Sequence, residues 1–187
     1  MKRGTGCMTN PPAVIDTNVF SNFALTGNIN ILEILYGKKL YMPTIVIQEC
    51  EDKPELRPYI SDAISKGWLK EFVISYTLTP REFIEHTRIR KKFHPGEGAI
   101  LAIAKVNDFI VISDDMTGVK NYCKANGLKL KGSLGILYEA FRYQLITITQ
   151  GDKIIQDMIK FNNYKSPVQS MQEVLNWFAY RIGRELF

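Results

Sequence analysis

Cysteine and histidine are scarce in this sequence, and their scarcity excludes two kinds of small-protein scaffold. Its three cysteines, Cys7, Cys50 and Cys123, are far apart, and its only histidines are His86 and His94. An odd number of scattered cysteines indicates neither a disulfide framework nor a structural zinc site. This cysteine usage is typical of a reducing compartment, so we expect a cytoplasmic protein.

Long apolar runs are missing as well. No segment reaches the roughly 18 uninterrupted apolar residues that a membrane helix needs. The basic residues near the start are not followed by the apolar stretch of a signal peptide. We therefore expect no membrane partner. The chain has 187 residues, of which 45% are hydrophobic and 23% charged. This composition is typical of one globular domain with a substantial core.

Acidic residues are fewer than basic residues, 19 against 24. The formal net charge is +5 and the sequence pI is about 9.0. A basic surface attracts polyanions, because lysine and arginine near phosphates release condensed counterions. Many basic proteins bind no nucleic acid, so this surplus favours a nucleic-acid partner only weakly.

Short apolar segments alternate with segments of helical periodicity. Strands are expected at residues 13–15, 40–42, 69–75, 109–112 and 128–131. Helical spacing is found at residues 19–25, 29–36, 43–49, 56–65, 79–92, 97–106, 116–125 and 133–145. Strands separated by helices in this way predict an α/β protein, with a three-layer α/β/α fold around a central, mainly parallel sheet.

The two ends of the chain differ from this pattern. Residues 1–12, rich in Gly, Thr, Asn and Pro, are expected to form a flexible arm before a domain at residues 13–149. Residues 150–187 show helical patterns without strands and are expected to form a C-terminal helical extension. An apolar stripe at helical spacing comprises Met171, Val174, Leu175, Phe178 and Ile182. This stripe must be buried, either on the same domain or on the partner in a homodimer.

Carboxylates stand where the predicted strands end. Asp16 follows the first strand, and Asp114 and Asp115 follow the strand at 109–112. Glu49 lies about two turns into the helix after the second strand, and Glu97 opens the helix before the fourth. In open α/β sheets the ligand crevice lies beyond the carboxyl ends of the strands, so these acids are expected to gather in one cleft. Oxygen ligands of this kind suit Mg²⁺ or Mn²⁺.

Each acid also has a purely structural interpretation. Asp16 at a strand–helix junction is typical of a helix N-cap, and the same holds for Asp114 or Asp115. Glu97 satisfies the preference for negative charge in a first helical turn. Glu49 is one of several nearby acids and could be a solvated helix residue. No single position favours a metal site; the set of positions does.

Four segments resemble the acidic blocks of the PIN-domain family. They are Val-Ile-Asp-Thr-Asn (14–18), Ile-Val-Ile-Gln-Glu (45–49), Gly-Glu-Gly-Ala-Ile-Leu-Ala-Ile-Ala (96–104) and Val-Ile-Ser-Asp-Asp (111–115). The stretch Lys-Gly-Ser-Leu-Gly-Ile-Leu (131–137) is similar to the segment after the last strand in the prokaryotic branch that carries the Gly-Glu motif. The resemblance covers about residues 13–149 and implies a PIN-like nuclease domain.

The resemblance also implies roles for particular residues. Glu97 stands where many members have Asp. Asp115 is preferred to Asp114 as a ligand because it keeps the Ser/Thr-x-Asp spacing of the family. The implied catalytic and metal-binding acids are Asp16, Glu49, Glu97 and Asp115, with Asp114 as a further metal ligand and with Asn18 and Ser113 as polar groups behind them.

The activity implied is metal-dependent hydrolysis of single-stranded RNA with Mg²⁺ or Mn²⁺ as cofactor. Many small prokaryotic members are toxins silenced by an antitoxin protein, although the extension leaves RNA processing open. A basic cluster before Glu97 either follows the RNA backbone or is a solvated helix face; it comprises Arg88, Arg90, Lys91 and Lys92. His94 has no assigned role.

Two other functions remain open. One is a PIN-like module that has lost activity and binds RNA or protein; the presence of all four acids argues against it. The other is a haloacid-dehalogenase-like phosphatase, which also has an Asp after its first strand. Such phosphatases have a second Asp two residues later, where this chain has Asn18, and no residue obviously supplies their lysine.

Overall fold

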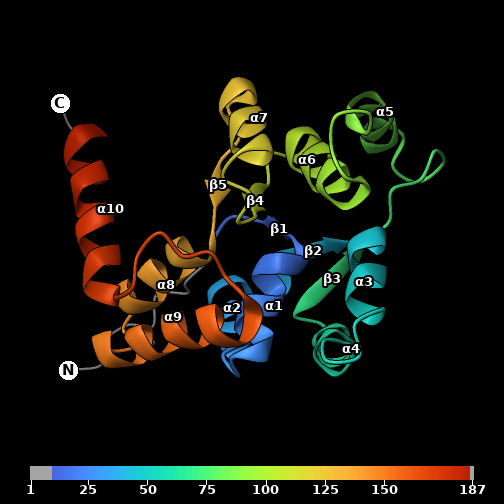
Figure 1. Cartoon of the computed structure of the whole chain (residues 1–187). Coiled ribbons are helices and arrows are strands. Elements are labelled where there is room, and N and C mark those ends of the chain that lie inside the picture. Colours follow the sequence, from blue (N-terminus) through green and yellow to red (C-terminus); the bar gives the residue numbers. More distant parts are fainter. Residues whose placement is uncertain (1–9, 186–187) are drawn as a thin grey trace, which may run out of the picture.

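The computed structural model describes residues 10–185, and side chains as far as residue 180. Its centre is a sheet of five parallel strands in the order β3-β2-β1-β4-β5 (Figure 1). The strands are β1 (Ala13–Ile15), β2 (Leu40–Pro43), β3 (Leu69–Phe72), β4 (Ile110–Ile112) and β5 (Leu130–Lys131). The predicted α/β fold with a parallel central sheet is therefore confirmed.

The middle of the sheet is apolar on both faces. Every residue of β1 is fully buried, and β1 pairs with β2 on one side and with β4 on the other. Helices must cover both faces of such a strand, which explains why it reads as a continuous apolar run. Because all strands are parallel, their carboxyl ends meet at one edge of the sheet. The chain places β2 and β3 on one side of β1 and β4 on the other, so β1 and β4 flank the point where the strand order reverses.

Helices flank the sheet on both faces (Figure 1). Helix α6 packs against β1, β2 and β4, and α5 and α7 pack on α6. Helices α8 and α9 contact each other, α8 also contacts α2, and α9 contacts α1. The helical elements up to α8 are α1 (Thr17–Leu25), α2 (Asn30–Tyr36), the 3₁₀ turn η1 (Gly37–Lys39), α3 (Thr44–Glu51), α4 (Arg57–Ser65), α5 (Pro80–Ile89), α6 (Pro95–Asn107), α7 (Gly118–Asn126) and α8 (Ser133–Arg142). None of the described helices is long and apolar enough to cross a membrane.

The sequence placed one strand end too late. The strand expected at residues 69–75 ends at Phe72, because the following segment bends into a turn. There the Thr79 amide donates to the Ser75 carbonyl at 3.0 Å, and the Thr79 hydroxyl donates to the Val73 carbonyl at 2.9 Å. These bonds use backbone groups that a longer strand would have paired in the sheet.

The C-terminal helices pack on the rest of the chain. They are α9 (Ile148–Asn162), whose first turn contains the expected boundary at residue 149, and α10 (Met171–Glu185), which contacts α8 and α9. In the apolar stripe, Met171 and Val174 are fully buried, and the Phe178 ring stacks on Tyr138 with centroids 4.5 Å apart. The side chain of Ile182 and residues 1–9 of the expected arm lie outside the described part of the chain. The homodimer stays a prediction.

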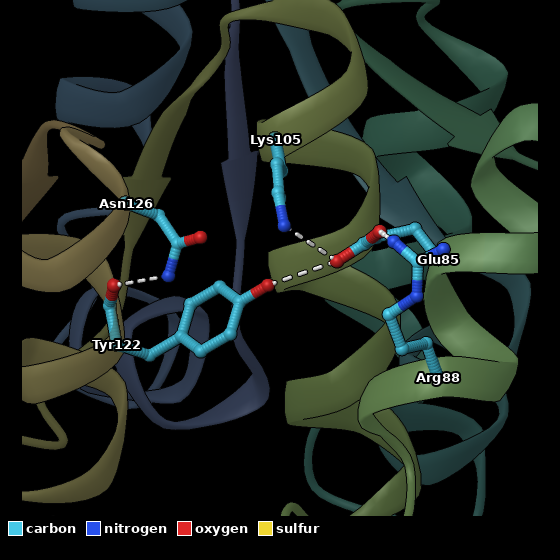
Figure 2. A network of polar contacts seen from close by, with 5 residues as sticks. All are labelled: Glu85, Arg88, Lys105, Tyr122 and Asn126. Carbon is cyan, nitrogen blue, oxygen red and sulfur yellow. Dashed lines mark hydrogen bonds and ion pairs between the residues drawn. The ribbon is translucent and has the colours of Figure 1, made fainter.

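A buried carboxylate joins the three helices on the α6 side of the sheet (Figure 2). Glu85 of α5 accepts hydrogen bonds from Lys105 of α6 at 2.8 Å, from the Tyr122 hydroxyl of α7 at 3.1 Å and from Arg88 at 3.0 Å. These donors outweigh the effect of burial, so the pKa of Glu85 lies below its ordinary value. Close by, Asn107 of α6 donates to Glu82 of α5 at 2.9 Å. The network holds α5 on α6, the helix whose first turn carries Glu97.

We expect Glu85→Gln to lower the free energy of unfolding by about 1–3 kcal/mol. Glu85 is buried, and its replacement leaves Lys105 and Arg88 without their carboxylate partner. Urea unfolding at neutral pH measures the change. Asp62→Asn is the matched control, since it breaks the exposed pair with Lys66 and should change nothing measurable. Equal effects in the two variants would contradict a structural role for the network.

Candidate active site

A pocket of about 440 Å³ opens at the carboxyl edge of the sheet, beside β1. Its walls come from the start of α1, from the end of α3 with the turn after it, and from the start of α6. The residues that line it are Asp16, Thr17, Asn18, Glu49, Asp52, Lys53, His94 and Glu97. Three of the acids named from the sequence, Asp16, Glu49 and Glu97, are therefore brought together.

Asp16 is the buried acid at the base of this pocket. Its amide donates to the carbonyl of Ile112 at 2.9 Å, which continues the pairing of β1 with β4. Its carboxylate accepts from the Thr17 amide at 2.7 Å and from the Ser113 hydroxyl at 3.2 Å, and only 7% of the residue is exposed. Burial raises the pKa of Asp16 to about 6, and the nearby charges of Glu97 and Glu49 add to the rise despite these two donors. Asp16 thus caps α1 and also faces the pocket.

Glu49 is half-buried at the end of α3. Its Oε2 accepts from the Thr17 hydroxyl at 3.0 Å, and its Oε1 lies 3.8 Å from Nδ1 of His94. The approach of α6 is close here: a Cβ added at Gly96 would lie 2.7 Å from Oε1 of Glu49. Glycine at position 96 therefore lets the first turn of α6, with Glu97, come up against Glu49.

Glu97 occupies the first turn of α6 and is half-buried. Its carboxylate accepts from the backbone amide of His94 at 3.3 Å, a bond that closes the start of the helix. The same carboxylate raises the pKa of Asp16, so the two charges lie within electrostatic reach of each other. Both roles considered from the sequence, helix start and member of an acidic cluster, apply to this residue.

Asp114 lies in a separate hydrogen-bond network and does not line the pocket. Its two oxygens accept from the Ser133 amide at 2.8 Å, from the Ser133 hydroxyl at 2.6 Å and from the Asn22 side chain at 3.0 Å. Burial raises the pKa of Asp114, and these donors offset part of the rise. Asn22 in turn accepts from Asn162 of α9. Asp114 thus connects the end of β4 with α8 and α1, and through Asn22 with α9.

Asp115 closes the start of α7 and does not line the pocket either. Its carboxylate accepts from the Thr117 amide at 2.8 Å, from the Thr117 hydroxyl at 2.6 Å and from the Val119 amide at 3.1 Å. Burial raises the pKa of Asp115, but these hydrogen bonds outweigh it, and the net pKa lies below the ordinary value. In this conformation Asp115 makes the contacts of a helix cap.

The two polar residues named beside the acids occupy different positions. Asn18 is exposed and lines the pocket. Ser113 is buried and lies between two of the acids: its hydroxyl donates to Asp16 and accepts from the amide of Asp115 at 3.2 Å. Ser113 is therefore a short polar link from Asp16 to the segment that starts α7.

The basic cluster lies outside the pocket lining. Arg88 pairs with Glu85 inside the helical network, whereas Arg90, Lys91 and Lys92 are exposed between α5 and α6. The lining instead includes four residues to which the sequence assigned no role: Thr17, Asp52, Lys53 and His94. Thr17 stands inside the Asp-Thr-Asn segment, which is the sequence signal that points to it. No local pattern identifies Lys53 or His94, because they reach the pocket only when α3 and α6 come together.

The donor set is chemically suited to a hard divalent cation. Asp16, Glu49 and Glu97 offer carboxylate oxygens to one pocket, and the charges of Glu97 and Glu49 raise the pKa of Asp16. Within the described residues, no three His, Cys, Asp or Glu side chains lie close enough to bind one ion. Coordination of one ion by all three acids therefore requires their carboxylates to come closer together than they are in this structure.

We expect Asp16→Asn to stabilise the metal-free protein above pH 6. Between the ordinary pKa of 3.8 and the folded value of about 6, the folded protein binds the Asp16 proton more tightly than the unfolded chain. The free energy of unfolding therefore falls as the pH rises through this window, by on the order of 2–3 kcal/mol. An asparagine at position 16 carries no charge, so this fall in stability disappears, and its side-chain oxygen can still accept a hydrogen bond from the Thr17 amide.

Urea unfolding in EDTA at several pH values measures the effect. Asp115→Asn is the matched control, for which we expect the opposite sign. The pKa of the Asp115 carboxyl group is lowered, so its charged form stabilises the fold above the ordinary pKa, and this contribution is lost as the pH falls. An Asp16→Asn variant less stable than wild type at pH 7.5, with an unchanged pH profile, would contradict the destabilising effect that we assign to the charged form of Asp16.

A family model described as a PIN domain matches residues 12–178, a span that takes in the whole pocket, α9 and part of α10. A search among curated proteins found no match. Membership of the Gly-Glu branch stays a prediction. Because the match extends over most of the chain and the sheet is that of an α/β domain, the chain belongs to the PIN-domain family, whose members are generally nucleases.

Proposed function

We propose that this protein is a metal-dependent endoribonuclease that hydrolyses phosphodiester bonds of single-stranded RNA. The observation that carries the proposal is the pocket itself, in which buried Asp16 shares one cavity with Glu49 and Glu97. Burying a carboxylate beside two others costs free energy, and a divalent cation offsets that cost. Family membership supports nuclease chemistry.

Asp16, Glu49 and Glu97 would hold Mg²⁺ or Mn²⁺. The cation would lower the pKa of a water molecule and balance the charge of the phosphate. Hydrolysis forms a bond from the water oxygen to phosphorus as the bond to the leaving ribose oxygen breaks; the water gives up one proton, and the leaving oxygen takes one up. Thr17 and Ser113 orient Glu49 and Asp16 through their hydroxyl groups. Asp115 holds the start of α7, and its part in metal binding stays open to test.

We further propose a cytoplasmic protein that works on cellular RNA. The family supports a toxin silenced by an antitoxin, and the same analogy supports RNA processing. The exposed cations at residues 90–92 precede the pocket residue His94, a position that suits the RNA backbone. An inactive binding module is disfavoured, because all three acids of the pocket are present.

Cleavage of a fluorescent single-stranded RNA oligonucleotide in Mn²⁺, Mg²⁺ or EDTA tests the proposal. We expect cleavage that requires a divalent cation and that Asp16→Asn abolishes, with no hydrolysis of a generic phosphomonoester. Asp115→Asn distinguishes ligand from cap: a cap variant retains Mn²⁺ affinity and loses stability, whereas a ligand variant loses Mn²⁺ affinity. Full cleavage by folded Asp16→Asn would overturn the proposal.

Gly96→Ala tests the geometry without removing a carboxylate. The added methyl would meet Oε1 of Glu49, so we expect this side chain to be displaced and the metal-dependent rate to fall roughly tenfold or more. Gly98→Ala is the matched control, since its methyl would meet His86 rather than Glu49. Titration of the thermal midpoint with Mn²⁺ reports metal affinity in both. If Gly96→Ala lost no more activity than Gly98→Ala, the close approach would not matter to the site.

A further inference from the structure

Lys53 is the one lysine among the eight residues that line the pocket, four of which are acids. It follows α3 in the turn that leads to α4, and it lines the cavity together with Asp16, Glu49, Asp52 and Glu97. The backbone of this turn is held on both sides. The Lys53 amide donates to the Cys50 carbonyl at 3.2 Å, and the Lys53 carbonyl accepts from the amides of Leu56 at 2.9 Å and Arg57 at 3.1 Å. An ordered turn therefore presents this side chain at the pocket.

The ammonium group of Lys53 forms no ion pair with the side chains that the structure describes. Four of the described lysines pair with carboxylates, Lys66 with Asp62, Lys105 with Glu85, Lys131 with Glu139 and Lys153 with Asp157, whereas Lys53, like most of the others, does not. Lys53 has acids within its own pocket and yet stays unpaired. Its N–H donors are thus left for a ligand that carries negative charge.

A phosphodiester needs such a donor here. Four carboxylates repel an approaching phosphate, and one divalent cation would offset only part of this negative charge. We propose that Lys53 binds a non-bridging oxygen of the RNA phosphate at the cleavage site and holds it against the acids. This inference rests on the proposed ribonuclease function and adds a substrate-binding residue to it. A hydrogen bond from an ammonium group strengthens as negative charge builds up on the phosphate oxygens, so Lys53 contributes to both binding and rate.

The experiment compares Lys53→Ala, Lys53→Arg and a control, Lys129→Ala. Lys129 is exposed, precedes β5 at the opposite edge of the sheet, and is not part of the pocket, so its variant loses the same charge elsewhere. We expect Lys53→Ala to lower kcat/KM on the RNA oligonucleotide roughly tenfold or more, Lys53→Arg to recover part of it, and Lys129→Ala to stay within about twofold of wild type. The slope of log kcat/KM against log salt should become shallower by about 0.7 in Lys53→Ala, for one lost phosphate contact.

Mn²⁺ affinity gives a signature that a merely structural role would not produce. Removing a cation from the pocket should leave Mn²⁺ binding as tight as in wild type or tighter, while RNA cleavage falls. A fall in both would assign Lys53 to the structure of the metal pocket and overturn the inference. Unchanged kcat/KM and an unchanged salt slope in Lys53→Ala would overturn it as well.

RNA binding separates this inference from the ribonuclease function. Fluorescence anisotropy of the same oligonucleotide with Asp16→Asn protein and with the Asp16→Asn, Lys53→Ala double variant measures affinity without cleavage. If wild type cleaves RNA and only the Lys53 predictions fail, the ribonuclease stands without this contact. If wild type does not cleave RNA, the ribonuclease proposal fails; a weaker Kd in the double variant still supports the contact, and an equal Kd overturns it.

Discussion

The contact between the ends of β1 and β4 is the constraint on which the site depends. Asp16 pairs through its backbone with Ile112 and accepts a hydrogen bond from Ser113, so its carboxylate is held at the point where the strand order reverses. Only 7% of Asp16 is exposed, and this burial raises the pKa of its carboxyl group. Under the proposed function, a bound cation would make this position of the carboxylate favourable.

The second requirement is that α6 approaches α3 closely. Gly96 removes the side chain that would collide with Glu49, and the first turn of α6 then brings Glu97 within electrostatic reach of Asp16. Glu85 of α5 in turn helps to fix the position of α6, because it accepts hydrogen bonds from Lys105 of α6 and from Tyr122 of α7. A buried charge in α5 thus supports the placement of acids in a pocket that it does not touch.

Neighbouring carboxylates in this chain have different tasks because their donors differ. Asp114 receives hydrogen bonds from Ser133 and Asn22 and connects β4 with α8 and α1. Asp115 receives them from the start of α7. Asp16, one strand away, has fewer donors and more burial, and its pKa rises where that of Asp115 falls. Burial raises the pKa of both Asp16 and Asp114, whereas the donors around Asp115 outweigh burial, so the balance of burial against hydrogen-bond donors sets the pKa of each acid.

The order of elements and the kind of fold could be predicted from the sequence alone, because short apolar runs that alternate with helical periodicity allow few arrangements other than a covered parallel sheet. Asp16, Glu49 and Glu97 could be named for the same reason: strand ends and helix starts in such a sheet meet at one edge. The sequence could not decide what Asp114 and Asp115 contact, since that depends on Ser133 and Asn22, which are distant in the chain. Lys53 and His94 join the pocket only through the packing of α6 on α3. Local patterns determine which elements form, whereas contacts between distant segments decide which side chains share a site, because these contacts exist only in the folded chain.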